Sequence, residues 1–146
     1  MKQNKGYANL RKGRYSEKGL YYHIVITTKN RARIFENFTL ARKAIHCLKD
    51  SDTAELTETL SFVVMPDHIH WLLILRDSSI SKCIQRMKSQ FSRVTGLKVW
   101  QEGFYDQGIR SDDSLINIAR YIVANPLRVG LVESVGEYPH WDSVWL

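Results

Sequence analysis

A chain of 146 residues fits a single domain, and 44% hydrophobic with 25% charged residues is ordinary for a globular protein that buries a core. Two cysteines exclude a disulfide framework, and the longest apolar run, residues 71–75, is too short for a membrane span. The first twenty residues hold no apolar stretch, so we expect no signal peptide and a reducing cytosol as the compartment. The formal net charge of +6 makes nucleic acid the first candidate partner.

The basic excess is unevenly distributed along the chain. Residues 1–33 contain nine Lys or Arg and one acid, a local charge of +8, whereas residues 34–146 carry −2. We therefore expect a basic N-terminal arm, residues 1–18, followed by one domain, residues 19–146. A second stretch, residues 78–101, holds five basic residues and no acid. A charge run is most often a solvated surface, but two basic stretches in a short chain favour a polyanion site.

The first half of the domain predicts a strand, a helix and two further strands. Aromatic and β-branched residues at 20–28 are typical of a strand. Asn37 then caps a helix with its apolar residues on one face. Residues 60–65 and 68–75 predict two antiparallel neighbours, because the Pro-Asp pair at 66–67 breaks the run between them.

The second half predicts a helix, a short strand and a third helix. A serine in residues 78–79 opens the second helix, whose apolar residues recur every three or four positions, and Gly96 ends it. Residues 99–110 predict a short strand or hairpin. Residues 111–113 supply a cap and an acidic first turn for the third helix, which we expect to run to about Asn125 because a proline follows.

This order of elements, β-α-β-β-α-β with a closing helix, predicts an α+β fold. It matches the ferredoxin-like or RRM-like plan, an antiparallel sheet with helices on one face. That plan leaves the other face of the sheet open to a ligand, and RNA-binding modules of this shape stack bases there. The tail after the third helix is rich in Trp and Tyr but has no period that predicts an element.

His68 and His70 are the first candidate site residues. They lie two positions apart on a predicted strand, so both side chains leave one face, while Ile69 and Trp71 point to the other. Two imidazoles on one face can chelate a divalent metal, although a pair of strand histidines without any ligand is the alternative. Their apolar strand favours the metal, because buried polar rings need partners.

Tyr121 and Asn125 form a second candidate pair, at positions i and i+4 on the edge of the third helix's apolar face. Taken singly, a boundary tyrosine packs with a solvated hydroxyl, and an asparagine before proline ends a helix. Together with the two histidines, Tyr121 and Asn125 could form a site for phosphodiester cleavage. A tyrosine hydroxyl can attack a phosphodiester while a divalent cation, held by two histidines and one side-chain oxygen, polarises the phosphate.

The remaining reactive side chains have structural interpretations. His23 alternates with Val25 and is interpreted as a strand histidine satisfied by its neighbours. Cys47 and Cys83 lie in predicted helices and are interpreted as small packing groups or surface groups. No glycine pattern typical of nucleotide binding is present, so we expect no nucleotide cofactor.

Several segments resemble the single-tyrosine HUH transposases. Residues 65–70 (MPDHIH) resemble the histidine motif of that superfamily, and residues 22–35 resemble its first strand and basic turn. Residues 120–132 (RYIVANPLRVGLV) are similar to the branch called REP-associated tyrosine transposases, as are residues 100–110 and the closing run YPHWDSVWL. The resemblance covers nearly the whole chain from about Leu10.

The resemblance implies metal-dependent cleavage and rejoining of single-stranded DNA at hairpin-forming REP repeats, with Mg²⁺ or Mn²⁺ as cofactor. Tyr121 matches the nucleophile, which keeps the 5′-phosphate, and His68 and His70 match the metal ligands. Asn125 occupies the place of a Gln ligand in the insertion-sequence relatives, and Asn is usual in the repeat-associated branch. The implied partner is single-stranded or hairpin DNA. We expect a bacterial, nucleoid-associated, cytoplasmic protein with no membrane contact, either a monomer or a homodimer.

Basic side chains are the candidates for contacts with the DNA backbone. Such phosphate contacts position DNA without specifying its sequence. The candidates come from the basic arm, the turn after the first strand and the second helix: Arg11, Lys12, Arg14, Lys29, Arg31, Lys82, Arg86 and Lys88.

Two alternatives stay open. A catalytically silent protein would bind hairpin DNA without cleaving it, and a metal hydrolase that uses water would cleave without a covalent adduct. Every catalytic residue type that the resemblance requires is present, which favours the transesterase.

Overall fold

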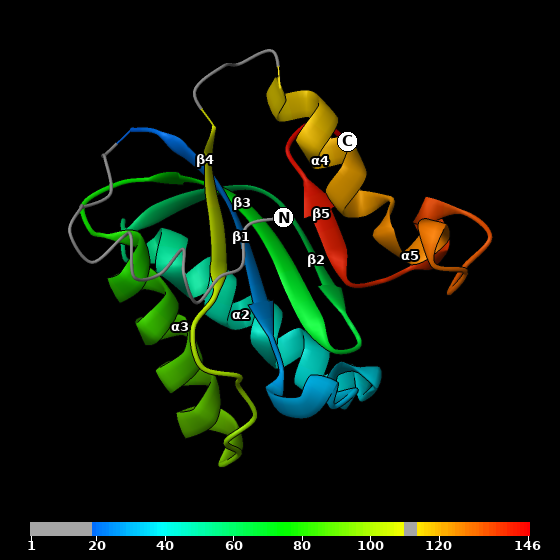
Figure 1. Ribbon diagram of the computed structural model, residues 1–146, viewed down its shortest axis with the longest axis horizontal. Helices are drawn as coiled ribbons and strands as arrows, with labels where there is room; N and C mark the ends of the chain where they lie inside the picture. Colours follow the sequence, from blue (N-terminus) through cyan, green and yellow to red (C-terminus); the bar gives the residue numbers. More distant parts are fainter. Residues whose placement is uncertain (1–18, 110–113) are drawn as a thin grey trace.

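The computed structural model describes residues 19–109 and 114–146 (Figure 1). Outside this description lie the expected helix cap at 111–113 and three predicted DNA contacts of the basic arm: Arg11, Lys12 and Arg14. In the part of the chain that is described, no helix is long and apolar enough to cross a bilayer.

Five antiparallel strands form one sheet in the order β4-β1-β3-β2-β5. The first four complete the predicted ferredoxin-like plan, and β5 extends the sheet beyond β2. The sequence did not predict β5, because its three residues are too few to show a period and it forms only by pairing with β2. The strands are β1 (Tyr21–Thr27), β2 (Thr57–Met65), β3 (His68–Leu75), β4 (Tyr105–Ile109) and β5 (Trp141–Ser143).

Helices α2 (Phe38–Thr53) and α3 (Ile80–Thr95) cover one face of the sheet (Figure 1). The predicted boundaries are confirmed. The side chains of Asn37 and Ser79 each accept a hydrogen bond from the backbone N–H three residues further on. Gly96 ends α3 in the left-handed conformation at φ +73°, which glycine adopts without a steric penalty.

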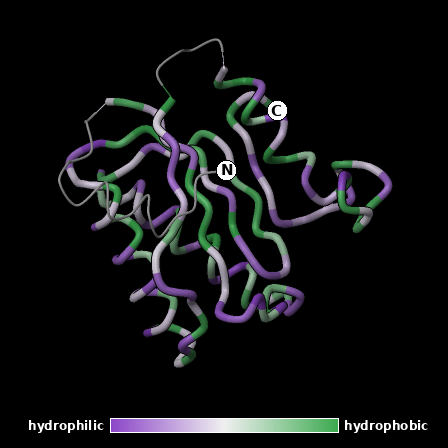
Figure 2. Tube along the Cα trace, viewed as in Figure 1, coloured by the Kyte–Doolittle hydropathy of each residue, from purple (hydrophilic) through white to green (hydrophobic). Residues whose placement is uncertain are grey.

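The main core lies between these helices and the sheet. Alternate strand residues such as Ile24 and Trp71 are fully buried there, and Figure 2 shows hydrophobic and hydrophilic residues alternating along α3. Burying each large apolar side chain stabilises the fold by roughly 1.5–3 kcal/mol. Cys47 and Cys83 are buried, free thiols of this core, which confirms their interpretation as packing groups.

Helix α4 (Leu115–Val123) lies on the opposite face and is followed by the short α5 (Asn125–Arg128). The expectation that this face is open is therefore wrong over β2 and β3, because the apolar stripe of α4 has to be buried against something. The second core contains Leu60, Val63, Met65, Leu72, Ile109, Leu115, Ala119 and Ile122. Short 3₁₀ helices complete the fold: η1 (Lys29–Arg31), η2 (Ile34–Glu36) and η4 (Val135–Glu137).

Candidate active site

Three histidines gather on the α4 side of the sheet. His68 and His70 leave β3 on the same face, as predicted, with ring centroids 5.0 Å apart. His23 joins them from β1, the neighbouring strand, where it lies diagonally across from His70. Its Nε2 lies 2.9 Å from Nδ1 of His70, and the two rings are stacked at 5.2 Å. The interpretation of His23 as a satisfied strand histidine is correct, but its partner is a site residue.

Burial keeps His23 and His70 neutral. Only 8% of each residue is exposed. Desolvation lowers the pKa of His23 to about 4 and that of His70 to about 2, and His70 is lowered further by the nearby charges of its neighbours, including Arg128. A neutral imidazole carries one N–H and one lone pair, so each ring can serve as a donor on one side and a ligand on the other.

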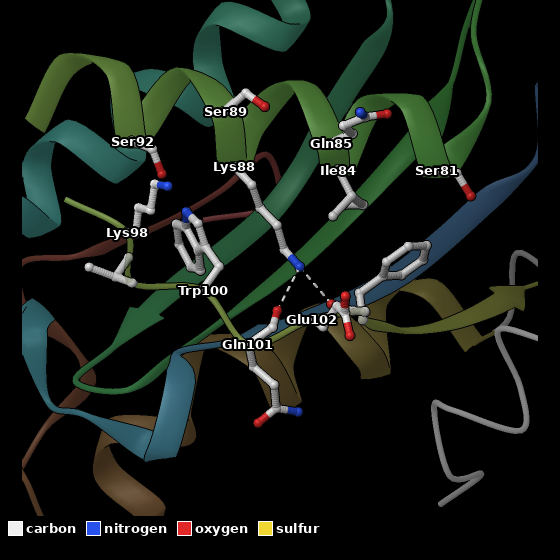
Figure 3. A pocket seen from close by; sticks show the side chains of 13 residues that line it. Ser81, Ile84, Gln85, Lys88, Ser89, Ser92, Lys98, Trp100, Gln101 and Glu102 are labelled. Atoms are coloured by element: carbon white, nitrogen blue, oxygen red, sulfur yellow. Dashed lines mark hydrogen bonds between the residues drawn. The ribbon is translucent and has the colours of Figure 1, made fainter. Parts of the chain in front are cut away.

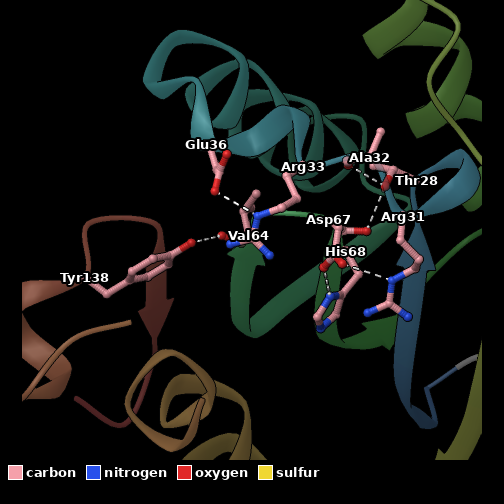
Figure 4. A network of polar contacts seen from close by, with 9 residues as sticks. All are labelled: Thr28, Arg31, Ala32, Arg33, Glu36, Val64, Asp67, His68 and Tyr138. Atoms are coloured by element: carbon pink, nitrogen blue, oxygen red, sulfur yellow. Dashed lines mark hydrogen bonds and ion pairs between the residues drawn. The ribbon is translucent and has the colours of Figure 1, made fainter. Parts of the chain in front are cut away.

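His68 is held by Asp67, which is held in turn by Arg31 (Figure 4). Asp67 Oδ1 lies 2.7 Å from Nδ1 of His68, and Asp67 Oδ2 accepts a hydrogen bond from Nε of Arg31 at 3.0 Å. Burial opposes ionisation of Asp67, but the hydrogen bonds from His68 and Arg31 outweigh it and lower the pKa of the carboxyl. Since a carboxylate only accepts, Nδ1 of His68 carries the proton and its Nε2 presents a lone pair.

Tyr121 projects from α4 toward the histidines. Its ring meets that of His70 edge to face, with centroids 6.0 Å apart, and 44% of the residue is exposed. The position on the edge of the apolar stripe is as predicted, because Ala119 and Ile122 anchor the helix in the second core while Tyr121 stays at its border. A half-exposed phenol beside a histidine cluster is accessible to a substrate.

Asn125 is buried beneath Tyr121, but it does not lie on the same helix. The predicted helix ends two residues early, at Val123, and Asn125 opens α5, where the following proline needs no backbone N–H partner. Its Nδ2 donates to the backbone oxygens of Tyr121 at 3.0 Å and Ile122 at 3.2 Å. With the amide nitrogen engaged, the amide oxygen is the atom that Asn125 can present to a ligand.

The side chains of the site fit a divalent metal ion that keeps open coordination positions. Within the described residues, no group of three or more His, Cys, Asp or Glu side chains could hold an ion alone. His68 and His70 supply only two such ligands, so an amide oxygen, water or a substrate oxygen must complete the sphere. Two imidazoles on one ion at ~2.1 Å hold their centroids about 5 Å apart, which is the spacing these rings show. The residues therefore fit an ion with open positions.

The five predicted DNA contacts that lie within the described residues are divided between the two faces of the sheet. Arg31 lies beside Asp67 and His68 on the active-site side, with Lys29 two residues before it in η1. Helix α3, which carries Lys82, Arg86 and Lys88, lies across the sheet from the histidines. Arg86 forms an ion pair with Asp50 at 2.8 Å. The basic helix is thus not beside the candidate site.

Lys88 has a structural role in the wall of a cavity. Its Nζ donates to the backbone oxygens of Gln101 at 2.9 Å and Gly103 at 2.7 Å, which ties α3 to the segment before β4 (Figure 3). Desolvation lowers its pKa to about 8. The cavity between α3 and residues 98–104 measures about 630 Å³. It lies on the α3 side of the sheet, away from the histidines.

Sequence reasoning missed Arg128 as well as the placement of His23. The Cζ of Arg128 lies 4.5 Å from the ring centroid of Tyr121. Arg128 follows Tyr121 by seven residues, about two helical turns, and that spacing was the available signal. No comparable local signal marks His23, because its neighbour is set by the register of two strands.

Comparison with known proteins shows the family to which this chain belongs. Residues 16–125 match the family model of IS200-like transposases. The REP-associated tyrosine transposase of Escherichia coli K12 is 30% identical over 131 residues, which cover 86% of this chain and 78% of that protein. The solved structure of a REP-associated tyrosine transposase bound to a REP hairpin has a TM-score of 0.77 and 27% identity, covering 88% of this chain and 79% of that one. The chain therefore belongs to the IS200-like transposases, in the branch of the REP-associated tyrosine transposases.

Proposed function

We propose that this protein cleaves and rejoins single-stranded DNA at hairpin-forming REP repeats, through a covalent 5′-phosphotyrosine at Tyr121 and with Mg²⁺ or Mn²⁺ as cofactor. One observation carries the proposal: the half-exposed Tyr121 ring faces the buried His70 ring at 6.0 Å in a chain of this family. The choice of DNA is supported by the relative whose structure holds a REP hairpin.

In the proposed cleavage, the hydroxyl oxygen of Tyr121 attacks the scissile phosphorus. The bond from the tyrosine oxygen to phosphorus forms as the bond from phosphorus to the 3′ oxygen breaks. The phenol loses its proton, and the departing strand takes one and leaves as a 3′-hydroxyl. Because the phosphotyrosine conserves the bond energy, a 3′-hydroxyl can attack it in the reverse direction and rejoin the strand.

His68, His70 and Asn125 would hold the divalent ion, through two imidazole Nε2 atoms and one amide oxygen. When bound, the ion supplies Lewis-acid polarisation of the phosphate and stabilises charge on the leaving oxygen. The chain's own contribution is orientation. Asp67 fixes the ring of His68, and the backbone of α4 fixes the amide of Asn125.

Arg128 is the cation best placed to contact the scissile phosphate. Its Cζ lies 4.5 Å from the centroid of the Tyr121 ring, and its positive charge contributes to the lowered pKa of His70. A guanidinium offers several N–H donors in a plane and matches phosphate oxygens in pairs. We assign it the role of holding the phosphate against the tyrosine.

Arg31 is the best candidate for a further backbone contact near the scissile bond. Its Nε is bound to Asp67, but its side chain is 61% exposed, so its other donors can reach a phosphate. Lys29 lies in the same short helix and is exposed. Lys82, Arg86 and Lys88 lie on the other side of the sheet and would contact only DNA that passes around the domain edge.

The test uses a labelled REP hairpin oligonucleotide with Mn²⁺ and denaturing gels that show covalent protein–DNA adducts. We expect the wild type and Tyr105→Phe, a control tyrosine near His23, to form the adduct, and Tyr121→Phe to form none. An adduct in Tyr121→Phe would contradict the proposed nucleophile. Cleavage without any adduct would identify a hydrolase that uses water, and hairpin binding without cleavage would identify a silent DNA-binding protein.

A monomer suffices for the proposed reaction, since Tyr121 faces His70 within one chain. Mixing Tyr121→Phe with His70→Ala tests this point, because each variant lacks one half of the site. We expect the mixture to remain inactive. Recovery of cleavage on mixing would mean that two chains exchange the tyrosine helix and that the homodimer is the active form.

A further inference from the structure

We propose that His23 is a positioning residue, which accepts a hydrogen bond from Nδ1–H of His70 and so holds the lone pair of His70 on Nε2, toward the active site. The proposal rests on the function proposed above in one respect, namely that His70 ligates a metal. His23 itself is not a ligand in this arrangement, and it acts through His70.

The contact is specific in geometry. Nε2 of His23 and Nδ1 of His70 are 2.9 Å apart, and the ring planes differ by only 27°. Both side chains come from the middle of paired strands, so the backbone sets their positions. The ring of Tyr105, from β4, lies nearly perpendicular to the His23 ring, with centroids 6.5 Å apart. His23 therefore contacts aromatic rings from both neighbouring strands, His70 from β3 and Tyr105 from β4.

The direction of the hydrogen bond decides which nitrogen of His70 can bind a metal. A bond between two imidazole nitrogens needs one N–H and one lone pair. If His23 donates, the proton of neutral His70 resides on Nε2 and blocks that atom. If His70 donates, its Nε2 is a free ligand. Nδ1 is engaged in either case, so ligation by His70 requires that His23 be the acceptor.

His68 has the same arrangement as His70, but its Nδ1–H is accepted by a carboxylate and not by an imidazole. Nδ1 of His68 is engaged by the carboxylate of Asp67 at 2.7 Å, which also leaves Nε2 as the ligand atom. The carboxylate lies near the surface, where Arg31 balances its charge. His23 is nine-tenths buried, and a neutral imidazole accepts a hydrogen bond there without the cost of burying an uncompensated charge. His68, nearer the surface, is therefore paired with a charged acceptor, and the more buried His70 is paired with a neutral one.

The first experiment determines the tautomer of His70 in the metal-free protein by long-range ¹H–¹⁵N correlation of its imidazole nitrogens. We expect a protonated Nδ1 and an unprotonated Nε2 in the wild type. In His23→Asn, whose amide is too short to reach Nδ1, we expect the Nε2–H form to gain population. A wild-type His70 with its proton on Nε2 would overturn the proposal, whatever the outcome for the metal.

The second experiment measures Mn²⁺ affinity by calorimetry, without DNA or turnover. Loss of a hydrogen-bond partner of a ligand typically weakens metal binding by about 10–100-fold, and we expect that loss in His23→Asn. His23→Gln carries an acceptor at the reach of the imidazole Nε2 and should recover most of the affinity. His140→Gln, which changes a buried histidine outside the cluster, should bind as the wild type does.

Thermal unfolding of the same variants separates positioning from folding. Equal melting temperatures for the Asn and Gln variants, with different Mn²⁺ affinities, support positioning. Equal Mn²⁺ affinities for both variants and the wild type overturn it. If the wild-type protein binds no Mn²⁺, the metal in the proposed function fails, and the tautomer of His70 still decides whether His23 is its acceptor.

Discussion

The two faces of the sheet differ in what their side chains do. On the α2 and α3 side, alternate strand residues such as Trp71 are apolar and fully buried. On the α4 side, the same strands present His23, His68 and His70 beside a smaller apolar core. One face stabilises the fold and the other holds polar groups at a desolvation cost. Neighbouring residues of β3 therefore have separable roles, which variants can test.

Removal of the metal by a chelator should have the largest effect on activity, because the proposed metal site lies on the α4 side of the sheet. We expect EDTA to abolish cleavage of a REP hairpin while hairpin binding persists, because phosphate contacts by basic side chains do not need the ion. Cleavage assays in EDTA measure the loss of activity, and gel shifts in EDTA measure hairpin binding. Returning Mg²⁺ should restore cleavage. Cleavage that persists in EDTA would remove the metal from the proposed function.

Adjacent residues of β3 offer the sharpest contrast. His70→Ala should reduce cleavage by at least ~100-fold, since it removes a ligand of the proposed metal. Trp71→Ala should instead lower the free energy of unfolding by about 3–5 kcal/mol, since it leaves a cavity in the main core. Urea unfolding and single-turnover cleavage should be measured on both. A similar loss of stability in the two variants would break the distinction between the faces.

Arg128 should affect chemistry more than binding. Arg128→Gln removes the charge beside Tyr121, and we expect the cleavage rate to fall by roughly 10–100-fold, as for other donors aimed at a reacting oxygen. Arg128→Lys should recover part of the rate, because it keeps the charge and loses the paired donors. Arg86→Gln, on the opposite face, is the control and should cleave normally. Equal losses in rate and hairpin affinity would reassign Arg128 to general DNA binding.

The buried histidines also predict how the stability of the protein depends on pH. In the unfolded chain a histidine titrates near 6.5, whereas burial lowers the pKa of His23 to about 4 and of His70 to about 2. Between pH 6.5 and 4 the unfolded state therefore binds more protons, so stability falls as pH falls. The expected slope is up to about 1.4 kcal/mol per pH unit for each histidine.

Removing one buried histidine tests that slope. In metal-free protein, His23→Gln should flatten the fall in unfolding free energy below pH 6.5, as measured by urea unfolding at several pH values. Cys47→Ala alters the other face, where burial raises the thiol pKa to about 11, and it should leave the slope unchanged. An unchanged slope in His23→Gln would mean that this histidine does not fold in its neutral form.

Features that depend on short-range interactions could be predicted from the amino-acid sequence. The helix boundaries at Asn37, at a serine of residues 78–79 and at Gly96 follow from side-chain capping and from the left-handed conformation of glycine, which act within a few residues. The common face of His68 and His70 follows from the two-residue period of a strand. The edge position of Tyr121 follows from the helical period. Each of these predictions needed only short stretches of the chain.

Contacts between segments that are distant in the sequence could not be predicted from local patterns. The β1–β3 register brings His23 to His70, and the seating of α4 brings Tyr121 to the same ring. Side-chain period shows which face a residue occupies, but pairing across the sheet is set by packing of the whole domain, and no local pattern carries that information.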